Sequence, residues 1–103
     1  MQYRPELADP PPGFEWDPVK AAVNLEKHGI TFIEASYVFK DAHRVDEDTT
    51  RPEHRETRRK VVGTVEDRLM TVVYTIRGDQ IRIISARRTR PDEARAYRQS
   101  AIR

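Results

Sequence analysis

The chain has 103 residues, of which 35% are charged and 37% hydrophobic, a composition that suits one domain with one modest core. It contains no cysteine, which excludes disulfides and thiol chemistry and favours the cytoplasm. No apolar run has the length of a membrane span, no signal peptide is visible, and the three histidines lack metal-ligand spacing. We therefore expect no membrane contact, no metal and no cofactor.

The net charge of +2 conceals a difference between the two halves of the chain. Residues 1–50 carry 5 Lys/Arg and 10 Asp/Glu, whereas residues 51–103 carry 14 Lys/Arg and 7 Asp/Glu. Such asymmetry indicates a polyanionic partner for the basic half. The positive charge of this half suits an acidic protein as well as a nucleic acid.

Residues 1–13 contain three consecutive prolines and are predicted to be a flexible leader, followed by a single domain over 14–103. A short strand at 14–16 opens this domain. Asp17 then has the side chain of a helix N-cap and Pro18 suits the first helical position. These signals predict a helix over 18–28, with the following glycine in the left-handed conformation. Its predicted apolar stripe is Val19, Ala22 and Leu25, with Val23 and Ala21 as further candidates.

A second short helix is predicted directly afterwards. Thr31 and Glu34 have the spacing of a capping box, and Phe32, Ala35 and Phe39 share one helical face. Residues 41–56 are polar and are predicted to form a loop or an exposed edge strand.

The next part of the chain is predicted to be an antiparallel meander. Runs of β-branched and aromatic residues at 60–65, 69–76 and 80–88 predict three strands. Glu66-Asp67 and Gly78-Asp79 provide the tight turns between them. A C-terminal helix follows, with Ala94, Tyr97 and Ala101 on one face. The predicted class is α+β: two N-terminal helices, an antiparallel sheet and a C-terminal helix.

Three arginines on the last predicted strand are the first candidate site. Arg87 and Arg88 end the strand, and paired guanidinium groups suit phosphate. Alternation places Arg82 on the same face as Arg88, with Arg87 on the other. The simpler alternative is that these arginines are solvated or paired with the nearby acidic residues 92 and 93.

The second candidate site lies at the entry to the sheet. Period-two alternation places Glu56, Arg58 and Lys60 on one face. A carboxylate between cations stays ionised, so Glu56 can accept a proton or orient an arginine; the alternative is a solvated edge strand. Tyr97 can stack on a base, or it can be a core residue with a wet hydroxyl. For His28, the end of a helix favours a capping role over acid–base chemistry.

A combination of motifs then indicates a family, which the chain resembles over about residues 14–98. The motifs are Trp16-Asp-Pro-x-Lys20, Asn24-x-x-Lys-His-Gly29, Phe32-x-Glu-Ala35, Val73-Tyr-Thr-x-Arg77 and Arg82-Ile-Ile-Ser-Ala-Arg87. Together they resemble the BrnT family of bacterial toxins. The resemblance implies a RelE-like ribonuclease fold, the toxin half of a type II toxin–antitoxin pair, and RNA cleavage that inhibits translation. It also implies a BrnA-like antitoxin with a ribbon-helix-helix part. Only this antitoxin, and not the toxin, would contact the operator DNA.

The leading hypothesis is a metal-independent endoribonuclease in which a ribose 2′-oxygen attacks the adjacent phosphate. Glu56 would be the base, and the catalytic arginines Arg58, Arg87 and Arg88 would stabilise charge, because arginine is always protonated. The predicted RNA-binding residues are Lys60, Arg82 and Tyr97, of which the lysine or the tyrosine would act as acid. The alternative is a non-catalytic basic binding module that acts on DNA as an antitoxin-bound corepressor.

Overall fold

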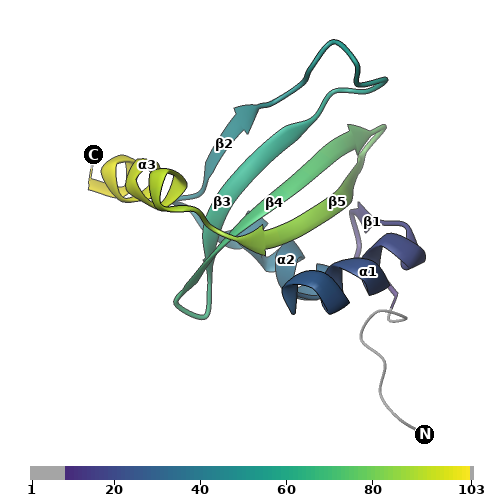
Figure 1. Cartoon of the computed structure of the whole chain (residues 1–103), viewed down its shortest axis with the longest axis horizontal. Helices are drawn as coiled ribbons and strands as arrows, with labels where there is room; N and C mark the ends of the chain where they lie inside the picture. The colour runs from purple at the N-terminus through teal and green to yellow at the C-terminus, as the bar shows by residue number, and fades with distance from the viewer. Residues whose placement is uncertain (1–8, 103) are drawn as a thin grey trace, which may run out of the picture.

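The computed structural model describes residues 9–102, which form one mixed five-stranded sheet and three α-helices (Figure 1). The strands lie in the order β1-β5-β4-β3-β2, with β1 parallel to β5 and the other neighbours antiparallel. The elements in chain order are β1 (Phe14–Glu15), α1 (Pro18–His28), α2 (Phe32–Ser36), the 3-10 helix η2 (Tyr37–Lys40), β2 (Val45–Asp48), β3 (Arg59–Val65), β4 (Arg68–Arg77), β5 (Gln80–Arg88) and α3 (Pro91–Ile102).

The α+β class is confirmed, but two parts of the prediction were wrong. The sheet is mixed rather than antiparallel, because β1 pairs in parallel with β5. Helices α1 and α2 therefore lie between two strands of the sheet and do not precede it. Residues 1–8 of the predicted leader lie outside the described residues, while the Gly13 carbonyl accepts a hydrogen bond from the Ile81 amide at 2.8 Å. None of the helices in residues 9–102 has the length and apolar character to cross a membrane.

Local sequence signals set the ends of the first two helices as predicted. The Asp17 carboxylate accepts from the Val19 amide at 2.8 Å, and Gly29 ends α1 with a φ of 68°, a conformation that costs glycine little. The capping box that opens α2 is present, with Thr31 and Glu34 satisfying each other's backbone amides.

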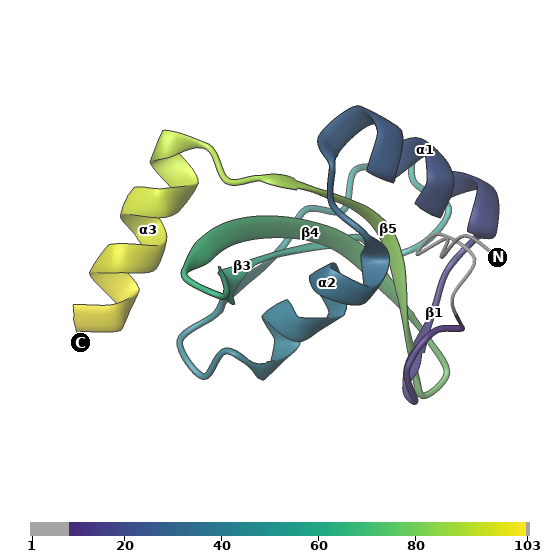
Figure 2. The ribbon, with the colours of Figure 1, turned by 90° about the horizontal axis from the view of Figure 1, so that it is seen from below.

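The buried face of α1 differs from the predicted stripe. Val19 and Val23 are 70% and 54% exposed, whereas Asn24 is 5% exposed. The Asn24 amide donates to the Ala86 carbonyl at 2.9 Å and accepts from the Ala86 amide at 3.0 Å. Helix α1 thus lies along β5 (Figure 2). Because β1 pairs only with Ile81 and Arg82, Asn24 satisfies backbone groups that the rest of β5 would otherwise leave unpaired on that side.

The sheet has one apolar and one polar face. Val61, Val72 and Ala86 are register partners with 0% exposure, and register partners point to the same side. This side packs on α2, η2 and the buried Phe32. The opposite side carries a more polar row of partners, Val62, Thr71 and Arg87, with Lys60 further along β3. We call it the polar face.

A register shift in β5 changes which arginines share the polar face. Val73 pairs with Ser85 but Tyr74 pairs with Ile83, so Ile84 has no partner. This extra residue reverses the alternation. Arg82, opposite Thr75, therefore lies on the same side as Arg87, opposite Thr71. The prediction that Arg82 shares a face with Arg88 was wrong for this reason.

Helix α3 begins at Pro91 and stands at one end of the sheet (Figures 1 and 2). On its predicted packing face, Ala94 is 9% exposed and the Tyr97 hydroxyl donates to Asp41 at 2.7 Å. The side chain of Ala101 lies outside the described residues. Helix α3 thus packs against β2 and β3, and polar contacts join its first turn to Thr71 near the start of β4 and to Arg87 at the end of β5.

Candidate functional site

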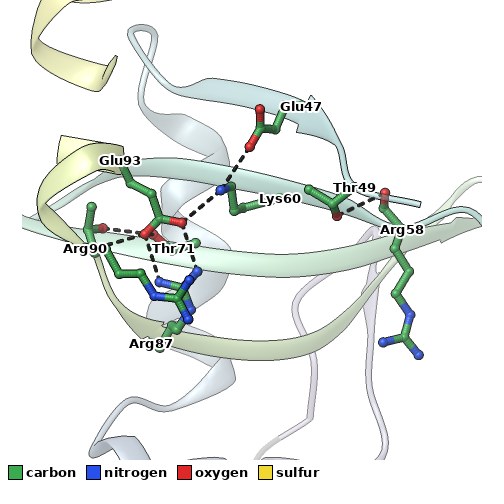
Figure 3. A network of polar contacts seen from close by, with 9 residues as sticks. Glu47, Thr49, Arg58, Lys60, Thr71, Arg87, Arg90 and Glu93 are labelled. Carbon is green, nitrogen blue, oxygen red and sulfur yellow. Dashed lines mark hydrogen bonds and ion pairs between the residues drawn. The ribbon is translucent and has the colours of Figure 1, made fainter. Parts of the chain in front are cut away.

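A buried carboxylate, Glu93, organises the junction between α3 and the polar face (Figure 3). Its Oε1 accepts from Arg87 Nη1 at 2.8 Å, from the Thr71 hydroxyl at 3.1 Å and from the Arg90 amide at 2.9 Å. Its Oε2 accepts from Arg87 Nη2 at 2.8 Å and contacts Lys60 Nζ at 3.0 Å. Lys60 Nζ also contacts Glu47 at 2.9 Å. We call Glu47, Lys60, Thr71, Arg87 and Glu93 the Glu93 network.

The position of Glu93 in the helix explains its reach. Ala94 donates its amide to the Arg90 carbonyl, so Arg90 is the N-cap and Glu93 is the third helical residue. A glutamate there turns back to the N-cap amide. In this chain the same carboxylate is only 5% exposed, and it links the start of α3 to strands β3, β4 and β5.

The network fixes the charge of its members. The hydrogen bonds from Arg87 outweigh burial and hold the pKa of Glu93 well below its usual range. Contact with Glu47, and then with Glu93, raises the pKa of Lys60, and the Glu93 carboxylate raises that of Arg87. Since Lys60 and Arg87 contact the same oxygen, their cationic nitrogens lie side by side. Arg87 gives its bidentate edge to Glu93, so its remaining N–H groups and those of Lys60 are the donors that one phosphate can bridge.

The remaining predicted residues of the polar face lie further along the strands. Arg82 is 3.8 Å from the Glu15 carboxylate. Glu56 contacts Arg77 at 3.5 Å, and Arg77 is the register partner of Gln80 at the start of β5. A rise of about 3.3 Å per residue along β5 puts Glu56 roughly 20 Å from Arg87. The structure therefore does not bring Glu56 together with the Arg87 end of the strand.

Arg58 also lies apart from the Glu93 network (Figure 3). Its backbone is tied to the preceding loop, with its carbonyl accepting from Thr49 at 2.9 Å and its amide donating to Thr50 at 2.8 Å. Its Nε is buried and makes no hydrogen bond to any described residue. A buried donor without a partner costs free energy, so Arg58 is a candidate for a ligand contact.

Tyr97 serves the anchorage of α3. Its hydroxyl donates to Asp41, which also accepts from the Thr64 amide at 2.9 Å. Burial opposes ionisation of Asp41, but the hydrogen bonds from Tyr97, Thr64 and His43 lower its pKa to about 2. Burial, together with this carboxylate, raises the pKa of the Tyr97 phenol. A base-stacking role for Tyr97 stays a prediction.

Arg88 points to the other side of the sheet, because it pairs with Met70 while Arg87 pairs with Thr71. It lines a cleft of about 610 Å³ together with His28 and Arg98. No three His, Asp or Glu side chains within the described part of the chain form a group able to hold a metal ion.

Sequence reasoning missed the central residue of the site. Glu93 was considered only as a neutralising partner for the strand-end arginines, and that pairing is confirmed for Arg87. The available signal was that Glu93 lies at the third helical position, three residues after the N-cap Arg90. Its burial and its contact with Lys60, 33 positions away, could not be read from the sequence.

The fold and the site define a small α+β domain that presents a fixed lysine–arginine pair on the polar face of a sheet. The chain belongs to the BrnT family, because residues 16–93 match the family model described as the ribonuclease toxin BrnT of a type II toxin–antitoxin system. Membership implies a ribonuclease toxin that has an antitoxin as its partner. No curated protein matches the chain.

Proposed function

We propose that this protein is a metal-independent endoribonuclease of RelE-like fold that cleaves RNA in the cytoplasm and so inhibits translation. The observation that carries this proposal, beside family membership, is the lysine–arginine pair held by Glu93. Attack of a ribose 2′-oxygen on the adjacent phosphate builds negative charge on the phosphoryl oxygens. Cations that are already fixed in place stabilise such charge without reorganisation at the moment of reaction.

The polar face supports a path for the RNA strand. Arg82 and Arg87 lie on this side of β5 because of the register shift, and the half-buried Arg58 stands directly before the start of β3. In the proposal, Lys60 and Arg87 hold the scissile phosphate, while Arg58 and Arg82 hold phosphates further along the strand. Contacts of this kind position the backbone and carry little sequence information.

Because Glu56 and Arg87 lie far apart, the scissile phosphate can lie near one of them but not near both. With the phosphate between Lys60 and Arg87, stabilisation of charge does most of the work and Glu56 is not the base: water takes the proton of the 2′-hydroxyl, and Lys60 protonates the 5′-oxygen as it leaves. Beside Arg58 and Arg82, Glu56 can take the proton of the 2′-hydroxyl. We favour the first placement because Glu93 fixes both cations. Cleavage that survives Glu56→Gln and falls in Arg87→Ala supports it; the opposite pattern supports the second.

Cleavage of purified RNA by the purified chain tests the activity itself. Because the proposed attack by a 2′-oxygen needs no metal-bound water, we expect cleavage to persist in excess EDTA. Loss of activity in EDTA that magnesium restores would contradict the mechanism. A wild-type chain that binds RNA or DNA but cleaves neither would favour the alternative, a non-catalytic corepressor. Growth arrest on expression without an antitoxin, relieved by Arg87→Ala, is the matching test in cells.

We also propose that a BrnA-like antitoxin with a ribbon-helix-helix part neutralises the toxin by placing carboxylates near Arg58, Arg82 and Arg88, and that operator DNA is bound through the antitoxin. Such binding weakens as salt rises. The competing surface is α1, where Val19 and Val23 are exposed. Hydrogen exchange separates the two arrangements: protection at 58–62 and 82–88 is expected, and protection confined to α1 and α2 would contradict it.

A further inference from the structure

A second concentration of positive charge lies beyond the Glu93 network, around the end of β5. It is the cleft of about 610 Å³ whose lining includes His28, Arg68, Arg88 and Arg98, and we call it the arginine cleft. These side chains come from the end of α1, the start of β4, the end of β5 and the second turn of α3. In Figure 2 the chain leaves β5 beside α1 and crosses to α3. Three elements thus bring arginines, and α1 brings a histidine, to one concavity.

The charge in the arginine cleft is less neutralised than the charge of the Glu93 network. In the network, Lys60 and Arg87 face two carboxylates. In the cleft, Arg68 contacts Glu34 at 3.4 Å, but neither Arg88 nor Arg98 makes an ion pair with any residue in 9–102. Asp67 also lines the cleft, which leaves an excess of positive charge. Exposed arginines without partners keep their hydrogen-bond donors available to an incoming anion.

The cleft has the size and lining of a nucleotide subsite. Its volume lies within the range of about 300–1,000 Å³ typical of ligand sites. Leu69 and Ala94 contribute apolar surface beneath the cationic side chains, which suits a ribose or base next to its phosphate. A stable protein interface needs about 800 Å² from each partner, far more than a cleft of this size offers by itself.

The cleft and the proposed cleavage site meet in adjacent residues of β5. Arg87 and Arg88 are adjacent, with Cα atoms about 3.8 Å apart, and their side chains point to opposite sides of the end of β5. A strand held by Lys60 and Arg87 on the polar face would pass around the side of β5 to reach Arg88. We propose that the arginine cleft is a subsite for the phosphodiester backbone of RNA outside the cleavage site, with Arg88 and Arg98 as its phosphate ligands. This inference rests on the proposed function, because it extends the path of the same substrate.

The test measures binding to a short, fluorescein-labelled single-stranded RNA whose 2′-O-methyl riboses prevent attack by the 2′-oxygen. Arg98→Ala is the informative variant, and Arg95→Ala is its control, because Arg95 is an exposed residue of α3 outside the cleft. One charge-assisted contact contributes about 1.5 kcal/mol, so we expect Arg98→Ala to weaken binding about tenfold. The slope of log K against log salt should also fall by about 0.7, the value for one phosphate contact with a single strand. Arg95→Ala should leave the slope unchanged.

Three outcomes would overturn the subsite. Equal losses in both variants would show a diffuse field of charge, unchanged binding in Arg98→Ala would leave the cleft to a protein partner, and a lower thermal midpoint in Arg98→Ala would attribute the loss to folding. Cleavage of unmodified RNA by the wild-type chain is measured in parallel. Absence of cleavage with an intact Arg98 effect defeats the proposed function alone, whereas cleavage with no Arg98 effect defeats the subsite alone.

Discussion

Arg87 and Arg88 are neighbours in the sequence, but they occupy opposite environments. Arg87 is buried to about four-fifths of its side chain and is held by both oxygens of Glu93. Arg88 is exposed and faces a cleft. A cation that cannot move suits the stabilisation of charge in a transition state, because the protein was organised beforehand. A solvated cation suits binding that depends on salt and tolerates many sequences. Under the proposal, Arg87 on one side of the end of β5 stabilises charge and Arg88 on the other side binds the RNA backbone.

The largest expected effect comes from removing the two arginines one at a time. Loss of one fixed donor to a developing charge typically costs about 100-fold in turnover, so Arg87→Ala should lower kcat for RNA cleavage to that extent. Arg88→Ala should instead raise KM about tenfold, with kcat nearly unchanged. Steady-state kinetics with a defined RNA give both values, and circular dichroism checks the fold. Equal effects on kcat would remove the distinction between the two arginines.

A substitution of Glu93 sharpens the same comparison, because it should release Arg87 without touching Arg88. Glu93→Gln keeps the shape of the side chain but loses its charge, and we expect unfolding free energy in urea to fall by about 2 kcal/mol. The turnover number should fall with it, toward that of Arg87→Ala. Asp92→Asn is the control, since Asp92 is an exposed neighbour on α3. If Arg87→Ala lowers kcat equally in the wild-type and Glu93→Gln backgrounds, Glu93 does not position Arg87.

The smallest expected effect is a pH dependence of the unfolding free energy that comes from the Glu93 carboxylate beside Arg87. The folded protein lowers the pKa of Glu93, so its contribution is complete above the unfolded pKa of about 4.3 and is lost as pH falls toward the folded value. Unfolding free energy should therefore decrease between about pH 5 and pH 3. This slope should be shallower in Glu93→Gln. The part of the slope that remains is expected from Asp41, whose pKa is also lowered. An identical slope in both proteins would mean that the Glu93 carboxylate gains nothing from Arg87 and Lys60.

Much of the fold followed from short-range signals. Asp17, Gly29 and the Thr31–Glu34 capping box set the ends of α1 and α2 as predicted, and the strands of the meander agree within a residue at each end. These features depend on neighbours in the chain, so sequence is enough to find them. The parallel pairing of β1 with β5 depends on residues 67 positions apart, Phe14 and Ile81, and no local pattern predicts it.

For the candidate site too, the sequence predicted some features and missed those that depend on the register of the sheet. The sequence indicated Arg87, Arg88, Arg82 and Lys60 as cationic groups of a ribonuclease, and residues 16–93 carry the family match. Alternation alone placed Arg82 on the wrong side of β5, because one unpaired residue, Ile84, shifts the register. A bulge of this kind leaves no reliable mark in a run of apolar residues.

The sequence by itself determined the class of the domain and the limits of its main elements, because caps and alternation act over a few residues. The kind of chemistry came from the resemblance of its motifs to a family, which the match over residues 16–93 confirms. Only the tertiary structure decided which arginine is fixed and which is solvated. That outcome depends on Glu93, whose burial at the start of α3 brings together cations from β3 and β5. The tertiary structure likewise decided the role of Asn24, which binds the backbone of Ala86 from a helix that looked apolar on another side. Contacts over such sequence distances arise from packing, and packing is a property of the whole fold.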